Sequence, residues 1–236
     1  YSDPNTIYIA TGDKDAGDSY SVGVYKSMDG GLTWNPTGSM GATNPTRAGD
    51  ILIHPTNNQM LWCATNSGIY RTTDAGATWS RVRLGNFSQG SIRLKPGDPN
   101  TVYAVSNNVF YRSTNGGSSF TQVTTGLPTS SSRLLLDVTP ANANYVYILS
   151  AATGGGDFQG IYRSTDGGTS FTARNTTTDV FESNQSWYDL ALAVSPTNAE
   201  EIYTGCLNVW KSVNGGTSAT RLNNWSNPTG PSYTHA

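Results

Sequence analysis

The stretch Tyr25–Trp34 (YKSMDGGLTW) decides the fold, because the chain repeats it four more times. The further copies are Tyr70–Trp79 (YRTTDAGATW), Tyr111–Phe120 (YRSTNGGSSF), Tyr162–Phe171 (YRSTDGGTSF) and Trp210–Ala219 (WKSVNGGTSA). In each copy an Asp or Asn is followed by Gly or Ala and then by Gly. Asp and Asn side chains accept hydrogen bonds from nearby backbone amides, and glycine adopts the positive φ that such a turn requires. The repeat therefore predicts five β-hairpins.

A second repeated signal precedes the hairpins, a proline followed seven residues later by an aromatic residue. It occurs at Pro55 and Trp62, Pro96 and Tyr103, Pro140 and Tyr147, and Pro196 and Tyr203. A short apolar segment precedes each proline, at Ile51–Ile53, Ile92–Leu94, Leu134–Val138 and Leu190–Val194. One unit therefore reads strand, proline turn, strand, loop, strand, Asp turn, strand, which predicts a four-stranded antiparallel meander.

The spacing of these units predicts the architecture. The aromatic residues at 8, 62, 103, 147 and 203 recur at the interval typical of propeller blades. We predict an all-β fold, a single β-propeller over 1–236 with five blades at about 1–43, 44–87, 88–126, 127–180 and 181–229. Tyr1 stands where the first proline turn is expected, so the first blade lacks its inner strand. We therefore expect part of a larger propeller, with further blades or a neighbouring chain at the open edge.

Composition excludes several classes of function. Charged residues make up 13% of the chain and the formal net charge is −2, so we expect no nucleic-acid partner. The apolar runs are only a few residues long, so we expect no membrane span. Cys63 and Cys206 fall on corresponding strands of the second and fifth repeats, too far apart to bridge, and are predicted to be buried free thiols.

The turn pattern [ST]-x-[DN]-x-G-x-[ST]-[WF] resembles the Asp-box, or BNR repeat, of sialidases, sortilin-like receptors and xyloglucanase-type glycosidases. The resemblance covers the whole chain in five copies and implies a β-propeller. It also implies a secreted bacterial protein, extracellular or at the cell surface. The relatives include enzymes, receptors and scaffolds, so the resemblance leaves the function open.

The loop lengths indicate where function lies. In a meander the proline turns and Asp turns share one end of the blade, and both keep a constant length. Length varies only at the opposite end, in the long loops Gly12–Gly23, Ala151–Gly160 and Thr172–Tyr188. Binding residues usually lie on such loops. We therefore predict a ligand-binding surface at this variable end, with the aromatic residues Tyr20, Phe158, Phe181, Trp187 and Tyr188.

Two groups of Asp and Asn residues are interpreted differently, one as structural and one as a candidate metal site. The turn residues Asp29, Asp74, Asn115, Asp166 and Asn214 are predicted to be structural, because Asn replaces Asp in two of five copies and keeps the hydrogen bond. Asp13, Asp15 and Asp18 crowd a glycine-containing loop and form a candidate Ca²⁺ site. A solvated acidic loop is the favoured interpretation of this segment.

The favoured function is a non-catalytic extracellular binding or scaffold module that recognises a protein or a glycan. The alternative is part of a glycoside hydrolase resembling the xyloglucanase type, whose two carboxylates would come from Asp13, Asp50 and Asp189. Such pairs lie about 5 to 9.5 Å apart. The segment Tyr8–Asp13 is similar to the one in which xyloglucanase-type enzymes carry a catalytic Asp, whereas Asp50 and Asp189 stand at the starts of inner strands.

Two other hydrolase classes have little support in the sequence. Sialidase chemistry needs three arginines around a carboxylate, for which Arg47, Arg93 and Arg133 are the candidates, but no F-R-I-P-like segment precedes them. A serine hydrolase lacks the G-x-S-x-G motif.

Overall fold

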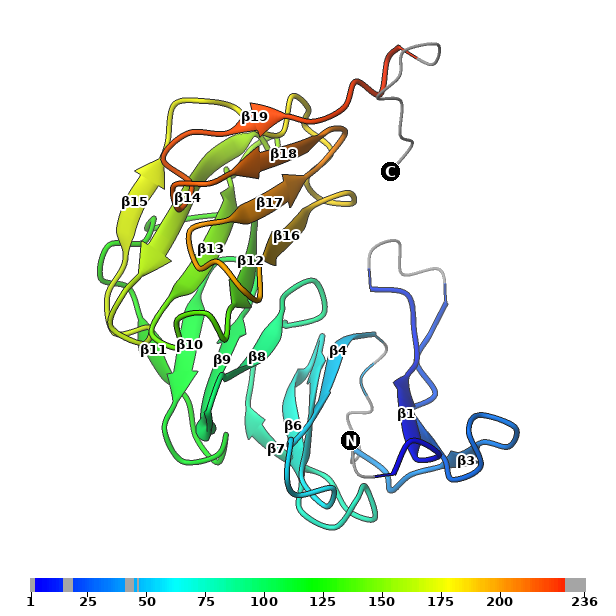
Figure 1. Ribbon diagram of the computed structural model, residues 1–236. Coiled ribbons are helices and arrows are strands. Elements are labelled where there is room, and N and C mark those ends of the chain that lie inside the picture. The colour runs from blue at the N-terminus through cyan, green and yellow to red at the C-terminus, as the bar shows by residue number, and fades with distance from the viewer. Residues whose placement is uncertain (1–2, 15–18, 41–44, 46, 228–236) are drawn as a thin grey trace.

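The computed structural model describes residues 3–14, 19–40, 45 and 47–227. Over these residues the secondary structure consists of strands β1 to β19, which form five antiparallel sheets (Figure 1). The prediction of an all-β chain of repeated antiparallel blades is confirmed. Within the same residues no helix reaches the length and apolar character needed to cross a bilayer.

Each sheet is an up-and-down meander, in which strands adjacent in sequence lie side by side. The N-terminal sheet contains β1 (Ile7–Ala10), β2 (Val24–Ser27) and β3 (Asn35–Pro36). The second contains β4 (Ala48–Ile53), β5 (Leu61–Thr65), β6 (Gly68–Thr72) and β7 (Ser80–Arg83). The third contains β8 (Ile92–Lys95), β9 (Asp98–Val105), β10 (Phe110–Ser113) and β11 (Thr121–Val123). The fourth contains β12 (Arg133–Val138), β13 (Val146–Ala151), β14 (Phe158–Ser164) and β15 (Thr172–Asn175). The fifth contains β16 (Ala191–Val194), β17 (Ile202–Gly205), β18 (Val209–Ser212) and β19 (Thr220–Arg221).

The sheets follow one another around an arc (Figure 1). The inner strands β4, β8, β12 and β16 contact one another in that order, and β1 contacts β4. The N-terminal sheet has three strands in the described part of the chain, as expected for a blade without its inner strand. The arrangement is that of propeller blades around a common axis.

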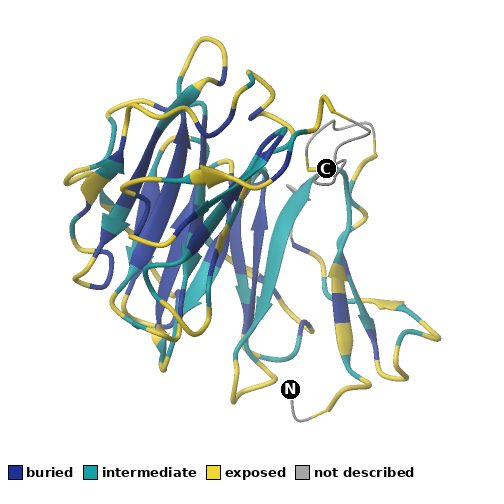
Figure 2. Ribbon diagram, turned by 45° about the horizontal axis from the view of Figure 1, so that its top comes forward, coloured by how far each residue is buried: buried dark blue, intermediate teal, exposed yellow. Residues whose placement is uncertain are grey.

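An apolar cluster fills each junction between successive sheets. The largest fully buried side chains include Trp62, Tyr103 and Tyr147, which belong to the aromatic series of the repeat. Figure 2 shows buried strands through the middle sheets and mainly intermediate or exposed strands in the N-terminal sheet. The stability of the arc therefore comes from sheet-to-sheet packing, repeated once per blade.

Both cysteines are free and buried, as predicted. Burial raises the pKa of the Cys63 thiol to about 12. Burial also raises the pKa of Cys206, which lies against the Ser183 hydroxyl. Both thiols therefore stay protonated at neutral pH and serve as small apolar side chains.

Candidate functional site

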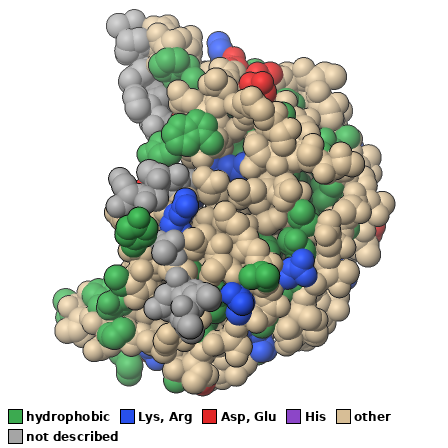
Figure 3. Space-filling view, turned by 180° about the vertical axis from the view of Figure 1, so that it is seen from behind, with side chains coloured by type: hydrophobic (Ala, Val, Ile, Leu, Met, Phe, Trp, Pro, Cys, Tyr) green, Lys and Arg blue, Asp and Glu red, His purple; other side chains and the backbone are tan. Residues whose placement is uncertain are grey.

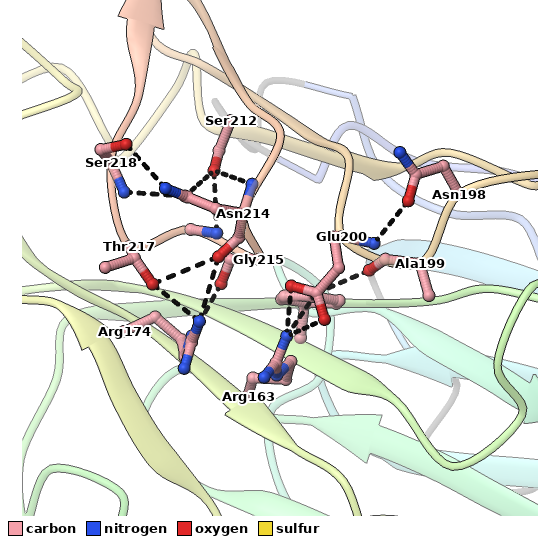
Figure 4. A network of polar contacts seen from close by, with 12 residues as sticks. Arg163, Arg174, Asn198, Ala199, Glu200, Ser212, Asn214, Gly215, Thr217 and Ser218 are labelled. Carbon is pink, nitrogen blue, oxygen red and sulfur yellow. Dashed lines mark hydrogen bonds and ion pairs between the residues drawn. The ribbon is translucent and has the colours of Figure 1, made fainter.

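The Asp-box turns are closed by one recurrent set of hydrogen bonds. In the fourth sheet the Asp166 carboxylate accepts from the Ser164 hydroxyl (2.7 Å) and from the Ser170 amide (3.0 Å). Asn214 accepts the corresponding pair in the fifth sheet at 2.9 and 3.0 Å (Figure 4). The same two acceptor contacts occur at Asp29, Asp74 and Asn115. These side chains bond within their own turns, which is the structural role expected of them.

The Asp-box turns and the proline turns lie at the same end of the blades. In every sheet the residue after the Asp or Asn donates its amide to a carbonyl just before, or near the start of, the strand that carries the aromatic residue of the repeat. The donor and acceptor pairs are Gly30 and Asn5, Ala75 and Gln59, Gly116 and Asn100, Gly167 and Asn144, and Gly215 and Glu200. The loops of variable length therefore lie at the opposite end, as the sequence predicted.

Trp187 and Tyr188 form an exposed aromatic pair at the variable end. Their side chains are 58% and 55% exposed, and the ring centroids are 5.5 Å apart. They lie in the connection between the fourth and fifth sheets, which reaches back to the neighbouring loop through the Ser186 hydroxyl and the Gly156 carbonyl. Two of the loops of variable length at this end thus lie side by side.

Arg133 anchors the backbone of this aromatic pair from below. It opens β12, is only 2% exposed, and donates from Nη1 to the carbonyls of Ser186 (3.0 Å), Trp187 (2.8 Å) and Tyr188 (3.3 Å). The Gln89 side-chain amide also donates to the Trp187 carbonyl at 3.4 Å. In the sequence Arg133 was a candidate only for a sialidase site. Its position at the start of an inner strand is the signal that could have indicated this structural role.

The other predicted ligand-binding aromatics lie in different environments. Phe181 is fully buried in the junction between the last two sheets and packs edge-on against Phe158 at 5.3 Å. The expectation of a ligand contact at Phe181 therefore needs correction, because packing leaves its ring no surface for a ligand. Phe158 is half-buried beside it. Tyr20 is strongly exposed on the first loop.

The carboxylate of Asp50 is engaged in a charged cluster on the inner strands. Its Oδ2 accepts from Arg93 Nη1 at 2.6 Å and from the Ile92 amide at 3.3 Å. Arg93 Nε also lies 3.3 Å from Asp137 Oδ1, and Asp137 Oδ2 accepts from the Val194 amide at 2.9 Å. The cluster joins β4, β8, β12 and β16. Asp137 was not singled out in the sequence, although a carboxylate inside the apolar run LLLDV is a visible signal.

The remaining acidic candidates are Asp189, Asp13, Asp15 and Asp18. Asp189 is half-buried directly after the aromatic pair, and its amide donates to the Gln185 carbonyl at 3.1 Å. The Asp13 amide donates to the Ser19 carbonyl at 2.9 Å. Asp15 and Asp18 lie outside the described residues. Among the residues that are described, no three His, Cys, Asp or Glu side chains come together to hold a metal ion.

A cavity of about 540 Å³ lies at the Asp-box end, between the second and third sheets. Its lining is largely apolar, from Leu52, Leu94 and the prolines of both turns, with Lys95 as its cation. In its lining β8 and β9 are joined by a tight Pro96–Gly97 turn, whereas the corresponding turn of the second sheet, between β4 and β5, is longer.

The repeated turns, the meander topology and the common axis agree with a comparison to known families. The family model described as Sortilin-Vps10 (sortilin, neurotensin receptor 3) matches residues 67–204. The chain belongs to the Sortilin-Vps10 family. The resemblance in the Asp-box residues is thus confirmed at the level of the family and the fold.

Sequence relatives of this Sortilin-Vps10 chain include enzymes. The chain is 39% identical over 88 residues to the xyloglucanase Xgh74A of Acetivibrio thermocellus, a match that covers 34% of this chain and 10% of that protein. The match thus spans about a tenth of the curated relative's length.

Solved structures extend the likeness to the whole arc. An ancestral GH74 enzyme matches with a TM-score of 0.72 at 23% identity, over 93% of this chain and 30% of that one. YCF48 bound to D1 peptide matches with a TM-score of 0.56 at 18% identity, over 86% of this chain and 62% of that one. At these identities the two structures show that the fold is shared, and nothing more.

Proposed function

We propose that the chain is an extracellular glycan-binding propeller module that holds an extended plant-type β-glucan at its variable end. The observation that carries the proposal is the exposed pair Trp187 and Tyr188 on a loop tied down by buried Arg133. Flat aromatic rings offer a large apolar surface with few rotatable bonds, so they bind at low entropic cost. A loop that is already ordered adds little further cost on binding.

The chemistry of the surface favours a neutral, hydroxyl-rich ligand over a charged one. The chain has few charged residues and a formal net charge of −2, so it provides no field to concentrate an anionic polymer. The segment just before the aromatic pair carries the hydroxyl of Ser183 and the exposed amides of Asn184 and Gln185, and such groups suit sugar hydroxyls. The curated relative with 39% identity is a xyloglucanase, which makes xyloglucan the first ligand to test.

The test is titration of the chain with xyloglucan oligosaccharides, followed by calorimetry and by Trp fluorescence. We expect Trp187→Ala and Tyr188→Ala each to weaken binding about tenfold or more, because a central aromatic contact contributes about 2 kcal/mol. Met28→Ala is the control, since Met28 is also a large apolar side chain and is 72% exposed, but it lies at the Asp-box end. Unchanged affinity in both aromatic variants would refute the proposal. A folded chain that binds no glycan would favour the other predicted partner class, a protein ligand.

Hydrolysis by a pair of acids is the second candidate, favoured by the xyloglucanase relative. Asp189 directly follows the aromatic pair and is half-buried, so it is the first carboxylate to test. Asp50 has a structural use in its ion pair with Arg93, which makes it the weaker candidate. Asp13 is the third. Release of reducing ends from xyloglucan by the chain, lost in Asp189→Asn or Asp13→Asn with binding retained, would support catalysis. Binding without any release would leave the module non-catalytic.

A further inference from the structure

The connection between the fourth and fifth sheets, residues 176–190, carries the aromatic pair. We call this connection the aromatic loop. Two hydrogen bonds shape turns within it. Asp179 Oδ1 accepts from the Glu182 amide at 3.2 Å. The Gln185 carbonyl accepts from the Tyr188 amide at 2.8 Å. Because both bonds lie inside the loop, the position of the aromatic pair relative to the sheets depends on other contacts.

Two charged side chains tie the aromatic loop to the sheets on either side of it. From the fourth sheet, Arg133 donates to three consecutive carbonyls of the loop. Toward the fifth sheet, the loop extends the Glu182 carboxylate. Asn208 Nδ2 donates to Glu182 Oε2, and Arg221 Nη1 donates to Glu182 Oε1 at 2.9 Å. Asn208 lies between β17 and β18, and Arg221 is on β19, so one carboxylate joins the loop to two parts of the fifth sheet.

The contact with Asn208 distinguishes Glu182 from an ordinary surface ion pair. The Glu182 and Arg221 side chains are 29% and 41% exposed, and an ion pair with that access to water contributes little by itself. Asn208 is only 3% exposed, and its Oδ1 accepts from the Trp225 amide at 2.9 Å. Without Glu182 the buried Nδ2 group would lose this acceptor, which is costly inside a protein.

Charged contacts of this kind are not a general feature of the surface. Charged residues make up 13% of the chain, and Lys and Arg side chains are scattered over the face drawn in Figure 3. A glutamate that joins a loop to a sheet is therefore a local feature of the aromatic loop.

The backbone at Glu182 supports a specific role for its side chain. Its φ is 54, and among the described residues Ala75 is the one other non-glycine residue with a positive φ. Ala75 belongs to an Asp-box turn, whereas Glu182 belongs to no repeat. Steric contacts make this conformation unfavourable for residues other than glycine. Such strain persists where surrounding contacts fix the residue, and it is common at binding sites.

We propose that Glu182 is a positioning residue for Trp187 and Tyr188. Its carboxylate fixes the aromatic loop against the fifth sheet, while Arg133 fixes it against the fourth. Glu182 acts through the loop backbone, because Asn208 and Arg221 occupy its carboxylate. The two rings are then in place before a ligand arrives, which lowers the entropic cost of binding. This inference rests on the proposed function of the aromatic pair as a glycan site.

The first test measures the order of the loop without any ligand. Glu182→Gly removes the contacts and relieves the backbone strain, and these effects on stability oppose each other, so the melting temperature should change little. The amides of Gln185, Tyr188 and Asp189 are hydrogen-bonded within the loop. We expect them to exchange with solvent at least about tenfold faster in Glu182→Gly, as measured by NMR, because a loop with fewer anchors opens more often.

A matched pair of variants controls for the loss of a carboxylate. Glu182→Gln keeps the length of the side chain and removes its charge, so it should speed the same exchange by a smaller factor. Glu200→Gln makes the same change in an ion pair with Arg163, which joins the same two sheets at the Asp-box end. It should leave the exchange of the aromatic loop unchanged. If Glu182→Gly does not fold, as its melting curve will show, Glu182→Gln replaces it in both tests.

The second test is calorimetric titration with xyloglucan oligosaccharides. We expect Glu182→Gly to bind about tenfold more weakly than the parent chain, because both rings must then be ordered on binding. Glu200→Gln should bind as the parent does. A parent chain that binds no glycan refutes the proposed function, and the exchange measurement alone then decides whether Glu182 positions the pair. Unchanged exchange in Glu182→Gly overturns the proposal, and so does faster exchange with the affinity of the parent.

Discussion

Arg93 Nη1 on β8 lies 2.6 Å from the Asp50 carboxylate on β4, and its Nε lies 3.3 Å from Asp137 on β12. One guanidinium therefore joins three successive inner strands close to the axis. Each carboxylate in turn accepts a backbone amide of a later sheet, from Ile92 and from Val194. The charges of this cluster hold blades together, and that use competes with a catalytic role for Asp50.

Replacing the central arginine should loosen the arc. We expect Arg93→Met to lower the free energy of unfolding by about 1 to 2 kcal/mol, because it leaves two carboxylates close together without their cation. The estimate is below that for a fully buried pair, because all three side chains keep some contact with water. Urea unfolding measures the loss, and an Asp50→Asn, Arg93→Met double-mutant cycle measures the coupling. A loss within 0.5 kcal/mol, roughly the range of neutral surface changes, would contradict this account.

The Asp-box carboxylates should make stability depend on acid. Hydrogen bonds lower the pKa of Asp74 to about 2, chiefly from the Thr72 hydroxyl, and that of Asp29 to about 2, chiefly from Thr33. The folded pKa lies below the unfolded value of about 3.9, so the ionised form stabilises the native state. This contribution is complete above about pH 5 and is lost as the pH falls through about 2.

Asp74→Asn should remove part of this acid dependence and keep the turn. Asn115 already shows the substitute geometry, accepting from the Ser119 amide and donating to the Ser119 hydroxyl. Between about pH 5 and about pH 2, a range that contains both the folded and the unfolded pKa of Asp74, we expect the melting temperature of Asp74→Asn to fall less than that of the parent chain. Asp74→Ala should be less stable at every pH, because the Thr78 amide loses its acceptor. Parallel melting curves for Asn and parent would show that this carboxylate does not control acid unfolding.

The ring hydroxyls at the junctions should contribute unequally. Tyr103→Phe removes a buried hydrogen bond to Gly167 of the next sheet and should cost about 1 kcal/mol. Tyr203→Phe removes a bond from a half-buried ring to Glu201 of the same sheet and should cost less than about 0.5 kcal/mol. The two residues hold equivalent positions, so each controls for the other. Equal losses in urea unfolding would mean that the junction contact adds nothing to stability.

The Asp-box turn of the second sheet holds an alanine in a backbone conformation that favours glycine. Ala75 adopts φ 57, in the left-handed region where Gly116 and Gly167 stand in their own boxes at φ 64 and 70. Relief of that strain exceeds the extra entropy of an unfolded glycine, so Ala75→Gly should raise the free energy of unfolding by about 0.5 to 1 kcal/mol. Gly116→Ala is the mirror control. A methyl group there meets no atom closer than 3.8 Å, so its cost reports the backbone alone. A less stable Ala75→Gly chain would contradict the strain argument.

The sequence alone predicted five blades, their meander order, the end of the blade that carries the turns, and the structural use of the Asp-box residues. These features depend on contacts within a few residues, such as Ser27 with Asp29. Turn chemistry and strand alternation are local, so they can be read from spacing. The aromatic series was visible for the same reason, as a constant distance from each proline.

Only the tertiary structure decided which members of equivalent residue types are available for function. Phe181 and Trp187 are both aromatics of one connection, yet the first fills a junction and the second faces solvent. Asp50 pairs with Arg93, which lies more than forty residues further along the chain. Arg133 donates to the carbonyls of Ser186 and Trp187, which are separated from it by more than fifty residues. Burial and ion pairing are set by which sheets come to lie next to each other, and no spacing within a single blade encodes that.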